Sequence, residues 1–325
     1  MTTTEVADHF NMNLTDHPYW AESSWFHWAI PEKSINGSFY SHVRPNMNLM
    51  MAGPYMWDPS GEYSFNCLYW DWQAMRLLPE GRYGVDYDKY DYSTPWGMSV
   101  ELLEPLKRYK LGYHREGFDL DLEFEATAEL HAVERKTTHG LSNAYNFHFE
   151  QPGRIVGTVV LDGVRYDVDT YTIRDGSHGP RFLEVMTPNG YTWSTADDKT
   201  GWHILGADNG DARNWDIVSG FGYLLRDGKM ASIVNGVRRV LERNGPRPSL
   251  VEVTAEDELG RTLHAIGRPK VAATFTPFPD RGTFWQQFAW DYDGFEGAVG
   301  EDQETRSIQD LRRWNRAGPE VWNAG

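Results

Sequence analysis

The sequence of 325 residues is long enough for about two domains, each with a buried core. It carries 47 acidic and 31 basic residues, and the formal net charge of −16 argues against nucleic acid or an anionic membrane surface as the main partner. A single cysteine excludes an internal disulfide. No stretch approaches the roughly 20 apolar residues of a membrane span.

The first sixteen residues form a polar lead-in without the basic and apolar segments of a secretory leader, so we expect a cytoplasmic protein. Aromatic residues make up 14% of the chain, which excludes disorder and suggests aromatic-lined cores or ligand sites. The segment 71–78, which Pro79 follows, predicts a short helix.

Residues 119–132 show the clearest periodicity. Even positions from Leu120 to Ala132 are apolar or small, and odd positions from Asp119 to His131 are polar. This alternation predicts a single long strand with one buried and one solvated face. We interpret the acidic residues at the odd positions as a solvated surface that also deters edge pairing.

Three hairpins follow in the chain. Asp162-Gly163 joins apolar runs at 154–161 and 164–168, and Asp227-Gly228 joins similar runs at 220–226 and 229–234. Asp-Gly favours a two-residue turn in which both residues adopt positive φ. A third hairpin is expected between 250–254 and 261–266.

The remaining sequence consists mainly of short apolar runs between Gly, Pro and Asp, and the segment 303–314 predicts a terminal helix. This pattern is typical of an all-β protein with few short helices, built from sandwiches or barrels. The pattern is interrupted near 182–200, so we expect domains at 1–185 and 186–325. The two similar Asp-Gly hairpins suggest that these domains are related.

No phosphate-binding loop, dinucleotide fingerprint, zinc-protease motif or serine-hydrolase elbow is present. His148 and Glu150 would share one strand face, but two ligands are too few for a metal and no third lies nearby in the sequence. We therefore expect neither a metal nor a cofactor.

Three clusters could carry acid–base chemistry. They are the aromatic segment 16–28, the segment 146–151 with His148 and Glu150, and the segment 173–181 with Asp175, His178 and two arginines. Each also has a structural interpretation: a packing corner, a satisfied core pair and a turn with an internal ion pair, respectively. Arg174 and Arg181 are the expected partners of buried charges at His148 and Glu150.

The residues of these clusters resemble the proteins related to carotenoid 1,2-hydratase and the AttH-like lipocalin-type proteins. The similarity lies in the segments 16–26, 148–157 and 174–181, and in an ending at 284–303. The resemblance implies two tandem lipocalin-like antiparallel barrels with a pocket at or between them. It also implies a protein that acts on apolar, isoprenoid-like or polyketide molecules. The carotenoid-hydratase pattern Asp-His-x-Trp-Gly differs here, because Gly176 and His178 occupy its His and Trp positions.

We therefore expect a cofactor-independent acid–base enzyme, a hydratase, dehydratase, isomerase or cyclase, acting on a terpenoid-, steroid- or polyketide-like molecule. Asp175 or Glu150 would be the acid, and His178 or His148 the base. The expected substrate contacts are Trp25, Tyr69, Trp70, Trp202 and Arg174.

Two alternatives stay open. The first is a non-catalytic carrier of a hydrophobic ligand, which would use the same aromatic lining. The second is a carbohydrate-active β protein, which would need two facing carboxylates. In every case the expected partner is a small molecule, and a homodimer is left open.

Overall fold

The computed structural model describes residues 7–8, 16–78, 90–134, 146–181, 188–210, 213–278 and 280–318. The chain forms two compact units. Unit 1 comprises Met1–Trp57, Leu68–Glu134 and Ala144–Phe182, and unit 2 comprises Asp58–Cys67, Arg135–Asn143 and Leu183–Gly325.

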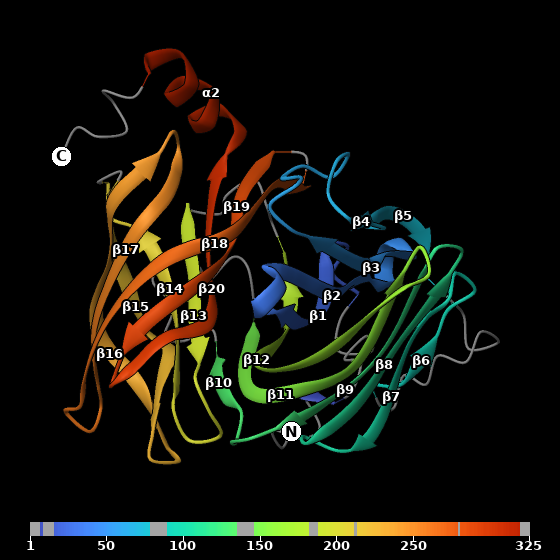
Figure 1. Ribbon diagram of the computed structural model, residues 1–325, viewed down its shortest axis with the longest axis horizontal. Coiled ribbons are helices and arrows are strands. Elements are labelled where there is room, and N and C mark those ends of the chain that lie inside the picture. The colour runs from blue at the N-terminus through green and yellow to red at the C-terminus, as the bar shows by residue number, and fades with distance from the viewer. Residues whose placement is uncertain are drawn as a thin grey trace. The chain divides into compact units, whose positions relative to one another are not determined.

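Unit 1 is one curled antiparallel sheet (Figure 1) with the strand order β4-β3-β2-β1-β12-β11-β9-β8-β7-β6; β5 also pairs with β3, and β10 with β11. Within the described residues the two ends of this path do not pair, so the unit is an open, curled sheet, consistent with the expected all-β lipocalin-like fold. Its elements are β1 (Trp20–Ile30), η2 (Pro31–Lys33), β2 (Ile35–Arg44), η3 (Pro45–Met47), β3 (Leu49–Trp57), β4 (Tyr69–Trp70), β5 (Gln73–Leu77), β6 (Tyr92–Ser93), β7 (Met98–Glu104), β8 (Arg108–Arg115), β9 (Phe118–Ala126), β10 (His131–Glu134), β11 (Phe147–Leu161) and β12 (Val164–Pro180).

One face of this sheet, here called the core face, carries the apolar core of unit 1. In β1 the residues Phe26, Trp28 and Ile30 belong to this core, and in β9 the residues from Phe118 to Phe124 alternate into it. The intervening residues point to the opposite face because successive strand residues alternate sides. The opposite face over β1, β2, β11 and β12 is here called the site face.

The predicted alternation is confirmed for 119–125, but the single long strand is wrong because β9 ends at Ala126. Beyond it the predicted faces are reversed, because His131 is buried and Ala132 is exposed. Ala126 pairs with Gly153, and the next residue of β11 is Pro152, which has no N–H to continue the ladder. Beyond that point β11 pairs with β10 instead, with His131 opposite Glu150.

Both Asp-Gly hairpins are confirmed. Asp162 and Gly163 have φ of 49° and 81° between Leu161 and Val164, and Asp227 and Gly228 have φ of 53° and 75°. A two-residue turn with positive φ at both positions matches the twist of the flanking strands. The third predicted hairpin is also present, as β17 and β18 of unit 2.

The predicted helix at 71–78 is wrong, because 73–77 form strand β5 against β3. Tertiary pairing overrides the helical propensity here: Leu77 lies opposite Leu49 and Arg76 opposite Met50, and the Arg76 guanidinium binds both carboxylate oxygens of Asp71. The predicted terminal helix exists but begins later, at Ile308, because 303–307 extend a strand.

Unit 2 is a closed antiparallel barrel of eight strands with helix α2 at one end (Figure 1). Ser307 caps this helix by accepting a hydrogen bond from the Asp310 amide. The elements are β13 (Asn189–Thr195), β14 (Gly201–Asp208), β15 (Asn214–Arg226), β16 (Lys229–Asn244), β17 (Arg247–Asp257), β18 (Thr262–Phe278), β19 (Arg281–Tyr292), β20 (Phe295–Ser307) and α2 (Ile308–Ala317).

The barrel of unit 2 contains a buried ion network beside its apolar core. Arg238 binds Asp302 through two hydrogen bonds of 2.6 and 2.5 Å, and Glu304 accepts hydrogen bonds from Arg243 and Arg306. Burial raises the pKa of Glu304, but the three guanidinium groups outweigh it and hold that pKa at about 2. The Glu304 carboxyl group is therefore ionised, and both buried acidic side chains are paired with guanidinium groups.

Candidate active site

The hairpin of β11 and β12 brings two of the three predicted clusters together. Its continuous pairing sets Glu150 opposite Asp175 and His148 opposite Ser177. His148 and Glu150 are two residues apart, so both point to the site face, as Asp175 and Ser177 do from β12.

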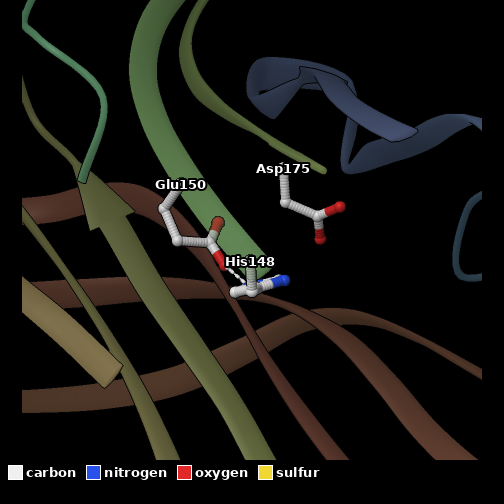
Figure 2. Close-up of side chains that lie close together, drawn as sticks. All are labelled: His148, Glu150 and Asp175. Carbon is white, nitrogen blue, oxygen red and sulfur yellow. Dashed lines mark hydrogen bonds and ion pairs between the residues drawn. The ribbon is translucent and has the colours of Figure 1, made fainter. Parts of the chain in front are cut away.

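His148, Glu150 and Asp175 form a buried acid–base cluster (Figure 2). The His148 Nε2 lies 2.5 Å from Glu150 Oε1, and one ligand atom of each of the three residues lies within 4.8 Å of the others. Glu150 is only 1% exposed, whereas Asp175 is half-buried. The site face therefore holds a hydrogen-bonded imidazole and carboxyl group with a second carboxyl group beside them.

Burial decides the charge of the imidazole in this cluster. It lowers the pKa of His148 to about 4; Asp175 opposes this shift and Arg181 adds to it. His131, which lies opposite Glu150, also has its pKa lowered to about 4, first by burial and then by His148. Both imidazoles are therefore neutral near pH 7 and can accept a proton.

A second polar group, the Arg181 cluster, adjoins the first on the site face. The Arg181 guanidinium lies 2.5 Å from Ser177 Oγ, 3.4 Å from Ser23 Oγ and 3.0 Å from His42 Nδ1. Tyr40 lies on the same face of β2 as His42 and interacts with both Arg181 and Ser23. Ser177 links the two clusters, because it is the register partner of His148 and a hydrogen-bond partner of Arg181.

An aromatic row borders these polar groups on the site face. Trp25 lies between Asp175 and Tyr40 in the strand register. Tyr40 stacks on Trp72 with 4.9 Å between ring centroids, and Tyr55 contacts Trp70 at 5.0 Å. Of the expected substrate contacts, Trp25 and Trp70 thus belong to the same face as the acid–base cluster.

The other predicted site residues lie elsewhere, and strand alternation explains two of them. His178 and Arg174 are an odd number of residues from Asp175 and point to the core face. His178 stacks between Trp20 and Phe147, with centroids at 5.4 and 5.3 Å. Arg174 donates to Gln151 and lies over the Tyr109 ring.

The remaining two expected contacts belong to apolar packing. Tyr69 stacks on Phe118 at 3.9 Å beside the core of unit 1. Trp202 is fully buried in the barrel of unit 2, against Trp290 and Tyr292. The structure therefore brings together His148, Glu150 and Asp175, with Trp25 beside Asp175 in the register, and it places Trp70 on the same face four strands away. It separates His178, Arg174, Tyr69 and Trp202 from this cluster.

Sequence reasoning missed His131, His42 and Tyr40, and it included Ser23 only as part of the segment 16–28. For Ser23, Tyr40 and His42 the signal was the alternation of polar and aromatic residues along β1 and β2, at Ser23 and Trp25 and again at Tyr40 and His42. Alternation alone does not identify which face is solvated and which carries a site, so these residues could not be assigned from the sequence.

Asp175 lies opposite Glu150 in the strand pairing and adds a third potential metal ligand beside His148 and Glu150. From the sequence alone we find no third ligand near these two residues. The present arrangement nevertheless favours proton transfer. Two atoms bound to one tetrahedral zinc at about 2.1 Å lie about 3.4 Å apart, whereas His148 Nε2 and Glu150 Oε1 are joined directly at 2.5 Å.

The buried histidines of unit 1 predict an acid-sensitive fold. Burial lowers the pKa of His27 to about 3 and those of His131, His148 and His178 to about 4, from 6.5 in the unfolded chain. The unfolded chain therefore binds more protons between pH 6.5 and 4. Stability is fully present above pH 6.5 and falls below it, by about 1.4 kcal/mol per pH unit for each histidine.

Denaturant unfolding followed by tryptophan fluorescence from pH 8 to 5 measures this slope. His178→Phe, which keeps a ring between Trp20 and Phe147, should remove about one histidine's share. His264→Gln, at an exposed side chain, is the matched control and should leave the slope unchanged. An unfolding free energy that stays constant from pH 7 to 5 would contradict the prediction.

These features define an all-β protein of lipocalin-like fold, with an open curled sheet and a closed barrel. The chain belongs to the family described as Domain of unknown function (DUF7064), whose model matches residues 5–300. The search of curated proteins found no match. Among the described residues, no helix has both the length and the apolar character needed to cross a bilayer.

The solved structures that share this fold include the following three. The AttH-like protein NE1406 of Nitrosomonas europaea has a TM-score of 0.56 and 10% identity, over 91% of this chain and 95% of that one. Kievitone hydratase of Nectria haematococca has a TM-score of 0.54 and 7% identity, over 94% and 95%. CghA has a TM-score of 0.55 and 11% identity, over 90% and 88%. The resemblance to AttH-like proteins is thus confirmed at the level of the fold.

Proposed function

We propose that the protein is a cofactor-independent acid–base enzyme, a hydratase, dehydratase, isomerase or cyclase, that acts on a hydrophobic small molecule. The observation that carries this proposal is the buried His148–Glu150 hydrogen bond with Asp175 beside it, bordered by the aromatic row. The fold shared with kievitone hydratase, whose name states a hydration activity, supports the same class of reaction. The cytoplasmic location and a homodimer stay predictions.

The cluster contains the groups that alkene hydration requires. A protonated carboxyl group, from Glu150 or Asp175, gives its proton to an alkene carbon, water adds to the neighbouring carbon, and neutral His148 accepts the proton that this water loses. Two carboxyl groups so close together favour keeping one proton between them. Dehydration is the reverse, and isomerisation returns the proton to a different carbon.

The aromatic row suits the charge that develops during carbon protonation. A carbocation is stabilised by the faces of Trp and Tyr rings, each by about 1–2 kcal/mol when water is excluded. Trp25, the register partner of Asp175, is the ring that we assign to this role. Trp70 and Tyr40 would hold the apolar skeleton of the substrate.

The carbohydrate-active alternative is less well supported. Glycoside hydrolysis uses two carboxyl groups that face each other across an open cleft, about 5 Å or more apart. Here Glu150 is almost fully buried and bonded to His148. The carrier alternative is an outcome of the experiment below.

Deuterium transfer to carbon tests the proposal. The purified protein, treated with a chelator and dialysed, is incubated in heavy water with a panel of terpenoid, steroid and polyketide alkenes and alcohols. Mass spectrometry is expected to show deuterium at carbon with at least one compound, and the chelator should not reduce the rate. Binding without deuterium uptake would instead indicate a carrier, and activity restored by an added metal would overturn cofactor independence.

A further inference from the structure

Arg181 places a buried positive charge next to the acid–base cluster. Its side chain is mostly buried, at 6% exposure for the residue, and its guanidinium lies against the hydroxyls of Ser23 and Ser177 and the His42 imidazole. Because a guanidinium only donates, the His42 Nδ1 must be the acceptor in the 3.0 Å contact. His42 is therefore held as a neutral imidazole and adds no positive charge of its own.

The neighbouring titratable groups, His42 and Tyr40, are also uncharged near pH 7. The pKa of His42 lies well below its ordinary value, first because of burial and then because of Arg181 and Arg44. Burial also raises the pKa of Tyr40, so its phenol keeps its proton beside Arg181. The Arg181 cluster thus contains two hydrogen-bond donors suited to a negatively charged oxygen, the guanidinium of Arg181 and the phenolic O–H of Tyr40.

The Arg181 cluster lies next to the acid–base cluster. Ser177 touches Arg181 and is the register partner of His148, and Tyr40 interacts electrostatically with both Arg181 and Asp175. A substrate that reaches the acid–base cluster along the aromatic row would therefore have part of its skeleton near Arg181. An oxyanion held there would stabilise the charge left when a proton is removed from an adjacent carbon.

We propose that the Arg181 cluster binds an acidic oxygen of the substrate, so that the substrate class is an apolar molecule with an enol, phenol or carboxylic acid group. This proposal rests on the proposed function for the location of the substrate on the site face. The proposal itself predicts that the protein binds an anion more tightly than a neutral ligand of equal shape. This preference can be measured without any turnover.

Binding of two matched probes tests this preference without any reaction. The affinities of 2-naphthoate and 2-naphthamide are measured at pH 8 by tryptophan fluorescence and by calorimetry. The natural protein is expected to bind the carboxylate at least tenfold more tightly than the amide. Arg181→Met is expected to weaken naphthoate binding by about 10–100-fold and to change naphthamide binding less than twofold.

Two further variants keep the test decisive. Arg154→Met removes an exposed arginine that pairs with Asp169 on the same strand pair, and it should change neither affinity. Arg181→Lys keeps the charge but loses the planar fork, so it should give an intermediate preference even if Arg181→Met does not fold.

The proposal is overturned if the natural protein binds both probes equally or binds neither at millimolar concentration. It is also overturned if a folded Arg181→Met weakens both probes alike. Failure of the deuterium experiment together with a strong anion preference would instead refute the enzyme and keep the anion site.

Discussion

Glu150→Gln is expected to lower turnover by about 10²–10⁴-fold while the protein stays folded. The amide has nearly the shape of the carboxyl group and can still hydrogen-bond to His148, but it cannot donate and recover a proton in the catalytic range. Asp175→Asn should cause a loss of similar size because it removes the second carboxyl group of the cluster. The rate of deuterium transfer to carbon, with circular dichroism as a check of folding, measures both effects.

His178→Phe is the matched control for these two variants. Its ring lies on the core face between Trp20 and Phe147, and the replacement keeps that stacking. We expect turnover within about threefold of the natural protein, a difference below ~1 kcal/mol in activation free energy. A folded Glu150→Gln protein with the natural rate would remove Glu150 from the mechanism. A His178→Phe protein that is folded but inactive would mean that turnover also depends on the core face.

Arg238→Met is expected to lower the free energy of unfolding of unit 2 by about 3–5 kcal/mol. The replacement retains much of the side-chain volume but leaves Asp302 fully buried without the guanidinium that binds both its oxygens. Glu304 loses one of its three positive neighbours but keeps Arg243 and Arg306. Urea unfolding at pH 7 measures the change.

Arg239→Met provides the comparison from the adjacent position of β16. Arg239 is half exposed and pairs with Glu252 at 3.4 Å, so its removal should cost no more than about 1 kcal/mol. Equal losses for the two variants would mean that burial does not make the Arg238 network costly to break.

The parts of the fold that could be predicted from the sequence are those determined locally. The Asp-Gly turns need positive φ at both positions, and the alternation in β9 separates a buried from a solvated face within one strand. The segment 71–78 failed because its structure is set by β3, which lies far from it in the sequence. No local pattern reports such a partner.

The candidate site also has a part that could be predicted from local sequence and a part that depends on distant strands. His148 and Glu150 were correctly placed on one face because they alternate along a strand. Asp175 and His178 were expected to act together because the segment 173–181, with glycines at 176 and 179, was interpreted as a turn that holds an acid and a base. The structure continues β12 through this segment, and a Cβ at Gly176 would lie 2.4 Å from the Phe149 ring. Gly176 therefore makes room for the Phe149 ring and does not form a turn. This role depends on the partner strand and could not be predicted from the local sequence.

The two-residue turn at Asp162 and Gly163 has a consequence far from where it lies. Pairing runs without a register shift from Leu161 and Val164 to Phe147 and His178, so the length of this turn determines that Glu150 meets Asp175. One inserted amino acid that was not absorbed as a bulge would move one arm by a single step and carry Asp175 to the other side of the sheet. Relatives that differ in loop length at this hairpin would then differ in chemistry, even with every cluster residue retained.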